Sequence, residues 1–104
     1  MAVDRSDVDS DGIDEQVLAM RGQGRSFARI AAAVGLDKAS QANVAFNRAL
    51  RRQSPEEQEE IRSKENARLD RLAASVQSDE ALSEADAERR LATVERLRAR
   101  LMRD

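Results

Sequence analysis

Apolar residues recur at helical spacing along most of the chain, and no segment alternates between apolar and polar residues as a half-buried strand would. Ile13, Val17 and Met20 predict a first helix that ends at the break Gly22-Gln23-Gly24, where two glycines lower helix propensity. Residues 1–12 are polar and acidic without periodicity, so we expect them to form a disordered arm. The pattern as a whole predicts an all-α protein.

Two short helices are expected next, joined by a sharp turn. Ser26 is a suitable N-cap for the first of them, and Gly35 directly follows its last apolar residue, Val34. With the helix before them, residues 13–53 have the pattern of a helix-turn-helix domain of three short helices. The last of these, over residues 38–52, places five apolar side chains on an arc that should face the core: Ala39, Ala42, Phe46, Ala49 and Leu50.

Two longer amphipathic helices are expected in the last part of the chain. Ser54, Pro55 and Glu57 supply an N-cap, a proline at the first helical position and a glutamate at the third, which together mark a helix start. Such a pair can fold back as an αα-hairpin or associate with another chain. Their apolar seams are thin: Ile61, Leu69, Leu72, Ala73 and Val76 in the first helix, and Ala87, Leu91, Val94, Leu97 and Leu101 in the second.

The composition limits the available chemistry. The 104 residues are 37% charged and 40% apolar, with two Phe as the only aromatic residues, which suits one small domain held together by aliphatic packing. The chain has no Cys, His, Trp or Tyr, so disulfides, zinc sites built on Cys or His, and thiol or imidazole catalysis are excluded. Since there is neither a run of about 18 apolar residues nor an apolar leader, we expect a cytoplasmic protein that does not enter a membrane.

Charge is distributed unevenly, although the net charge is only −2. Residues 25–53 contain six basic residues and a single acidic one, Asp37, whereas the segments before and after them are both net acidic. Positive potential should therefore be concentrated in the middle third of the chain, where it would attract an anionic partner.

Three groups of residues resemble metal-binding or reactive sites, and each has a simpler explanation. Asp7-Val8-Asp9-Ser10-Asp11-Gly12 matches the first half of an EF-hand loop, but Leu18 stands where the bidentate glutamate is required. The second group is the Ser and Lys residues, a possible nucleophile and base, but no glycine-rich elbow or phosphate loop frames any of them. We therefore expect no metal, no cofactor and no enzymatic activity. The third group consists of carboxylates that favour the dipole of a first helical turn: Glu56, Glu57, Glu59 and Glu60.

The face of residues 38–52 opposite the core arc is the best candidate for a binding surface. Its side chains suit base edges in a major groove, since Gln and Asn can pair with adenine, Arg with guanine, and Val with a thymine methyl. A merely solvated face would mix Glu with Arg, as residues 54–104 do, and this face has no Glu. Its residues are Ser40, Gln41, Val44, Asn47, Arg48 and Arg51, and the basic residues expected to contact phosphates around it are Arg25, Arg29, Lys38 and Arg52.

Short motifs along residues 13–101 add a resemblance. They are Ile30-Ala31, Val34-Gly35-Leu36, Ser40-Gln41-Ala42, Ala45-Phe46, Arg48-Ala49-Leu50 and Arg68-Leu69-Asp70-Arg71-Leu72. In these motifs the chain resembles a broad group of actinobacterial and actinophage helix-turn-helix proteins, some of them described as similar to phage terminase small subunits. The resemblance implies a helix-turn-helix without a wing, followed by a helical tail.

Together these features predict a sequence-specific protein that binds double-stranded DNA, most simply a transcriptional regulator that acts by occupying its site. One helix contacts too few base pairs to be selective, so we expect self-association through residues 54–104 and recognition of two half-sites. Two alternatives stay open. One is a helical adaptor that binds a protein partner through its charged C-terminal helices, and the other is a terminase-like DNA-binding protein of phage origin.

Overall fold

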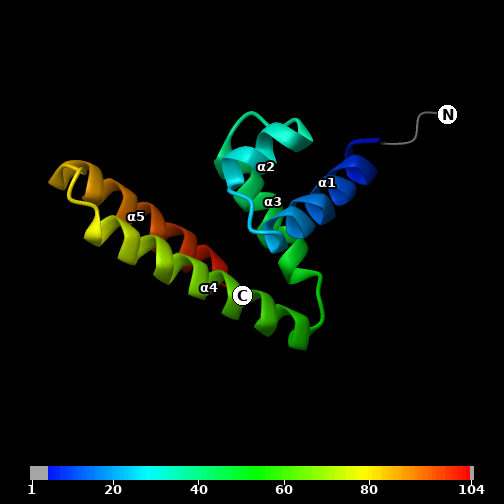
Figure 1. The fold of residues 1–104 in the computed structure, drawn as a ribbon. Helices are drawn as coiled ribbons and strands as arrows, with labels where there is room; N and C mark the ends of the chain where they lie inside the picture. The colour runs from blue at the N-terminus through cyan, green and yellow to red at the C-terminus, as the bar shows by residue number, and fades with distance from the viewer. Residues whose placement is uncertain (1–4, 104) are drawn as a thin grey trace. The chain divides into compact units, whose positions relative to one another are not determined.

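The structure is a computed structural model that describes the backbone of residues 5–103 and the side chains of residues 11–103. Among these residues it contains no strand, so the all-α prediction is confirmed. The chain divides into two compact units between Ser54 and Pro55, one residue from the predicted division. Figure 1 shows the five helices: α1 (Arg5–Gly22), α2 (Phe27–Val34), α3 (Ala39–Arg51), α4 (Pro55–Ser78) and α5 (Glu84–Leu101).

Helix α1 begins earlier than the sequence pattern predicts. It includes residues 5–12, so the expected disordered arm is wrong for this segment, whereas residues 1–4 lie outside the described part of the chain. Once a helix is nucleated, each added residue gains a backbone hydrogen bond, and acids in its first turns favour its dipole. The periodic apolar residues lie from the middle of α1 to its end, where Val17 is fully buried and Ile13 and Met20 are half-buried.

Helix α2 begins and ends where the sequence predicts. Ser26 Oγ accepts a hydrogen bond from the backbone N–H of Arg29 at 3.2 Å, which caps the start of α2. Gly35 ends α2 with a φ of +82°, in the left-handed region, and its N–H is bonded to the carbonyl of Ala31. The short connection and the left-handed residue fix the direction in which α3 leaves.

Replacing Gly35 with alanine should destabilise the protein by about 1 kcal/mol, because a Cβ is unfavourable in the left-handed region. Apart from Gly35 itself and its two chain neighbours, no residue has an atom within 4 Å of the added Cβ, so backbone strain is the only cost. Gly12→Ala is the matched control, since Gly12 lies within α1 with equally open surroundings and should gain helix propensity. Urea unfolding should therefore move in opposite directions for the two variants, and a stabilising Gly35→Ala would contradict the turn geometry.

Helix α3 lies at the centre of the first unit, because it packs against both α1 and α2. Phe46 meets Phe27 of α2 edge to face, with ring centroids 5.6 Å apart. Ile30 of α2 and Val17 of α1 are completely buried, and Leu50 of α3 is 1% exposed. These residues form the apolar core that fixes α3 relative to its neighbours.

The buried arc of α3 is wider than the sequence pattern predicts. Ala42, Phe46, Ala49 and Leu50 are buried as predicted, whereas Ala39, predicted to face the core, is exposed at the first turn. Because two helices rather than one cover α3, the arc also takes in three residues outside the predicted set: Asn43, Ala45 and Asn47.

The second unit is an antiparallel hairpin of α4 and α5, which lie side by side in Figure 1. Arg62 Nε donates to the carbonyl of Leu101 at 3.0 Å, and Arg98 donates to Asn66 and Asp70, each at 2.9 Å. Ser83 caps α5 by accepting a hydrogen bond from the backbone N–H of Asp86. The apolar residues buried between the helices are few: Leu69, Val94 and Leu101.

Candidate nucleic-acid interface

The exposed surface of α3 is a strip that α1 and α2 leave uncovered. Five of the six side chains predicted for this face are exposed. Val44 is 41% exposed, which is unusual for a branched apolar side chain in so small a unit. We call this surface the α3 strip; it consists of Ser40, Gln41, Val44, Arg48 and Arg51, and it carries no acidic residue.

Asn47 is the exception, and its predicted place on the binding face is wrong. The side chain is only 4% exposed, and its Nδ2 donates to the backbone carbonyl of Asn43 at 2.9 Å, one turn back in the same helix. Helix α3 packs against both α1 and α2, and its buried face extends beyond the predicted arc to Asn47. Asn47 therefore cannot pair with a base.

Gln41 lies on the strip but has a structural task at the start of α3. Its Oε1 accepts hydrogen bonds from the backbone N–H groups of Asp37 at 2.8 Å and Lys38 at 3.1 Å. These bonds satisfy donors that a helix start leaves unpaired. A bidentate contact with adenine needs both the oxygen and the amide nitrogen of Gln, so while the cap is intact Gln41 can offer only its Nε2 donor.

Arg48 is held by a carboxylate from another helix. Its Nε and Nη2 donate to the two oxygens of Asp14, both at 2.9 Å, so the contact is bidentate. The Asp14 side chain is 1% exposed, whereas the Arg48 side chain is 46% exposed. A buried anion on α1 therefore fixes a guanidinium that still reaches solvent on the α3 strip.

Arg52 also faces acidic residues of α1. Its Nη1 lies 3.3 Å from Asp14 and 3.8 Å from Asp11, and its Nη2 lies 3.3 Å from Glu15. Three carboxylates of α1 thus face the two arginines near the end of α3. The positive charge of the middle third is partly neutralised there, which the segment charges alone do not reveal.

The Asp14 cluster shifts pKa values in opposite directions. Burial by itself raises the pKa of Asp14, but the hydrogen bonds and charges of Arg48 and Arg52 outweigh burial and hold this pKa below its usual value. The hydrogen bond from Arg48 to Asp14 in turn raises the pKa of Arg48. Both groups are charged at neutral pH, and their attraction joins α1 to α3.

Acid should weaken the first unit through Asp14. A carboxyl whose pKa is depressed by folding adds stability that is complete above the pKa of the unfolded chain, about 4, and is lost as pH falls through the lower folded value. Urea unfolding from pH 6 to pH 2 should therefore show a larger loss of stability for the wild type than for Asp14→Asn, which cannot titrate. The same pH dependence in both proteins would contradict the assignment.

The other three basic residues predicted to contact phosphates are placed differently from Arg52. Arg25, Arg29 and Lys38 are all exposed, and no carboxylate among the described side chains is paired with them. An anion can therefore approach these three residues without breaking an ion pair with a described carboxylate. This is the surface where phosphate contacts were predicted.

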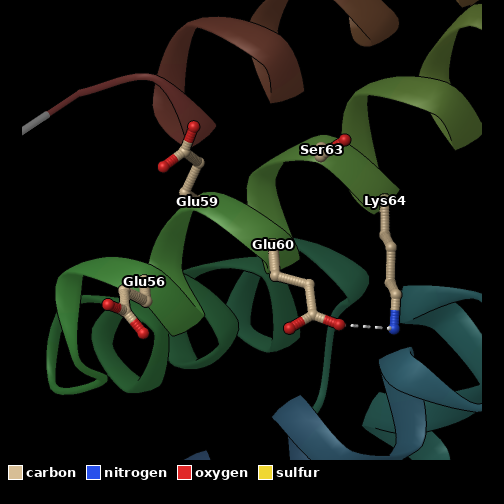
Figure 2. Close-up of a pocket in the computed structure, with 5 residues that line it drawn as sticks. All are labelled: Glu56, Glu59, Glu60, Ser63 and Lys64. Carbon is tan, nitrogen blue, oxygen red and sulfur yellow. Dashed lines mark ion pairs between the residues drawn. The ribbon is translucent and has the colours of Figure 1, made fainter.

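Elsewhere, the described residues offer little chemistry. Figure 2 shows an open depression along the first turns of α4, whose lining side chains are all exposed, with an ion pair between Glu60 and Lys64 at 3.5 Å. Such a pair one helical turn apart stabilises a helix slightly and needs no other role. In the part of the chain that the structure describes, no cluster of carboxylates could hold a metal ion. The depression is lined by Glu56, Glu59, Glu60, Ser63 and Lys64.

Within residues 5–103, no helix combines the length and the apolar character needed to cross a bilayer. Comparisons of the chain with protein-family models, curated proteins and solved structures find no match. The function must therefore be inferred from the α3 strip, the basic residues around α2 and the hairpin of α4 and α5.

Proposed function

We propose that the first unit binds double-stranded DNA, with α3 in the major groove, and that the protein acts as a transcriptional regulator by occupying its site. The observation that carries the proposal is the α3 strip. It presents an amide donor, a branched apolar group and two arginines at spacings of three and four residues, and α3 contains no acid that would repel phosphate. A recognition helix requires such a row of exposed side chains.

Phosphate contacts are assigned to the exposed basic residues around the α3 strip. Arg25, Arg29 and Lys38 have no described carboxylate partner, so they can approach the phosphates of the DNA backbone without breaking an ion pair. Arg52 is left out of the proposed interface, because both of its terminal nitrogens already face carboxylates of α1. DNA binding also requires that the protein lie in the compartment that holds DNA, in accord with the expected cytoplasmic location.

Selection from a randomised duplex library, followed by fluorescence anisotropy, tests the proposal. A selected duplex should bind at least about a thousandfold more tightly than a scrambled one, and the logarithm of the affinity should fall linearly with the logarithm of the salt concentration. Arg48→Ala should cost about 1–3 kcal/mol on the selected site and relax the preference for one base pair. Arg90→Ala, at an exposed position of α5, is the matched control and should leave binding unchanged. Failure to enrich any sequence would contradict the proposal.

The hairpin is proposed to mediate self-association, which would present two copies of α3 to two half-sites. Two helices that bury only three apolar side chains form a thin core, and Leu72 and Met102 remain 41% and 56% exposed. A symmetric dimer can cover such residues and place recognition helices about 34 Å apart, one turn of DNA.

Sedimentation of the wild type should therefore show a dimer at tens of micromolar, roughly the range in which weak dimers form. Leu72→Glu should shift the protein toward monomer without lowering its helix content, because Leu72 is exposed in the isolated chain. Ala74→Glu, at an exposed position of the same helix, adds the same charge and is the control. A wild type that stays strictly monomeric would contradict dimeric recognition and favour the alternative of a protein-binding adaptor.

A further inference from the structure

Asp14 is an unusual residue for the core of so small a unit. It lies on the buried side of α1, three residues before Val17, and its side chain is 1% exposed. Burying a carboxylate is unfavourable, and exchanging a buried ion pair for apolar residues of similar volume is often neutral or stabilising. Stability alone therefore does not explain why a charge occupies this position.

The contact between Asp14 and Arg48 uses one particular edge of the guanidinium. A guanidinium has five N–H donors, and Asp14 accepts from Nε and from one hydrogen of Nη2. The outer edge, formed by Nη1 and Nη2, keeps two parallel N–H groups. Two parallel donors at this separation match the N7 and O6 acceptors of guanine in the major groove.

We propose that Asp14 is a positioning residue that presets Arg48, so that the outer edge of its guanidinium pairs with one guanine. This proposal rests on the proposed function. A free arginine would lose side-chain entropy on binding, and an arginine already fixed by a buried carboxylate loses less. Asp14 would thus act on base preference through Arg48 without touching DNA.

Arg52 shows why the inference applies to Arg48 alone. Its outer edge is the one that the carboxylates occupy, since Nη1 faces Asp14 and Nη2 faces Glu15. Arg48 is clamped from the side and points its outer edge away from its partner. The same acidic face of α1 therefore neutralises one arginine and orients the other.

The test compares Asp14→Asn with Glu15→Gln. Each removes one negative charge from a residue of α1 that contacts Arg52, but of the two only Asp14 contacts Arg48. Anisotropy would be measured on the duplex selected by the wild type and on duplexes that carry each single base-pair change. Asp14→Asn should lower the preference for one guanine by about tenfold, at the position that Arg48→Ala also affects, and leave the other positions unchanged. Glu15→Gln should keep every preference.

Three outcomes separate the proposals. If the wild type selects no duplex, the proposed function fails. If Arg48→Ala loses the guanine preference and Asp14→Asn, shown by circular dichroism to be folded, keeps it, only the positioning role is overturned. If the preference falls equally at all positions in Asp14→Asn, Asp14 has a structural role and the proposal is also overturned.

A measurement on the wild type applies even if Asp14→Asn does not fold. The Nε–H signal of Arg48, assigned by its loss in Arg48→Lys, should exchange slowly with solvent in the free protein and in the complex with the selected duplex. Persistence of this protection in the complex supports positioning. Loss of the protection on binding would mean that Arg48 leaves Asp14 to contact DNA, which would overturn the proposal.

Discussion

Phe46→Ala is expected to unfold most of the first unit. The side chain is 2% exposed and packs against Phe27, and removing a buried phenylalanine costs about 3–5 kcal/mol. Domains of this size have stabilities of only a few kcal/mol, on the order of 0.05–0.15 kcal/mol per residue. The loss therefore equals most of the stability of the unit, and circular dichroism should show a large decrease in helical signal at 25 °C.

Val44→Ala is the matched control for Phe46→Ala. Val44 lies two residues away on the same helix and is 41% exposed, so its truncation should change stability by less than about 0.5 kcal/mol. If both variants unfold at the same urea concentration, the buried and exposed faces of α3 have been assigned wrongly.

The double variant Arg25→Glu/Arg29→Glu is expected to lose DNA affinity by about a hundredfold near 0.1 M salt. Each phosphate contact contributes about 0.9 to the slope of log affinity against log salt concentration, so removing two contacts should lower the slope by about two. Charge reversal adds repulsion to this loss. The result is measured by anisotropy on the selected duplex over a range of salt concentrations.

The loss of DNA affinity in Arg25→Glu/Arg29→Glu should not result from a loss of folding stability. Ser26 is the N-cap of α2 and Arg29 is the third helical residue, so Arg29→Glu creates the pairing of Ser and Glu that caps many helices. The melting temperature should stay the same or rise slightly. Arg90→Glu/Arg103→Glu makes the same change in net charge at exposed positions of the second unit and should retain binding. Equal losses in both double variants would mean that only total charge matters.

Local signals predicted the elements of this fold best where a cap or a glycine marks a boundary. Helix α2 begins after Ser26 and ends before Gly35 as predicted, because a cap hydrogen bond and a left-handed φ are local requirements. Ser83 was missed as the start of α5, although Ser83 followed by Asp86 at the third helical position is a comparable signal. The start of α1 was also missed, because residues 5–12 have no apolar periodicity to indicate a helix.

The interface could be predicted only in part, because burial depends on which helices meet. A helical wheel of α3 separates Phe46 from Val44, but it cannot show that the buried face extends to Asn47 once α1 and α2 both pack against α3. The pairing of buried Asp14 with a basic residue has a signal in the sequence. Asp14, Val17 and Arg21 lie three and four residues apart on α1, so a carboxylate shares a face with the apolar residues and requires a basic partner.

Which basic residue would pair with Asp14 could not be derived from periodicity. Arg48 and Arg52 are 34 and 38 residues away in sequence, and the contact depends on how α1 crosses α3. The charge sums of the segments likewise overstate the positive potential near the end of α3, because acids from another segment lie against it.

The most direct test of the central claim, that the α3 strip meets DNA, is a titration of ¹⁵N-labelled protein with the selected duplex, followed by two-dimensional NMR. The largest amide shifts are expected at Ser40, Gln41 and Val44, with smaller ones at Arg25 and Arg29. Residues 55–101, measured below the concentration at which the protein self-associates, should shift little. Shifts concentrated in α4 and α5, or none at saturating duplex, would contradict the account.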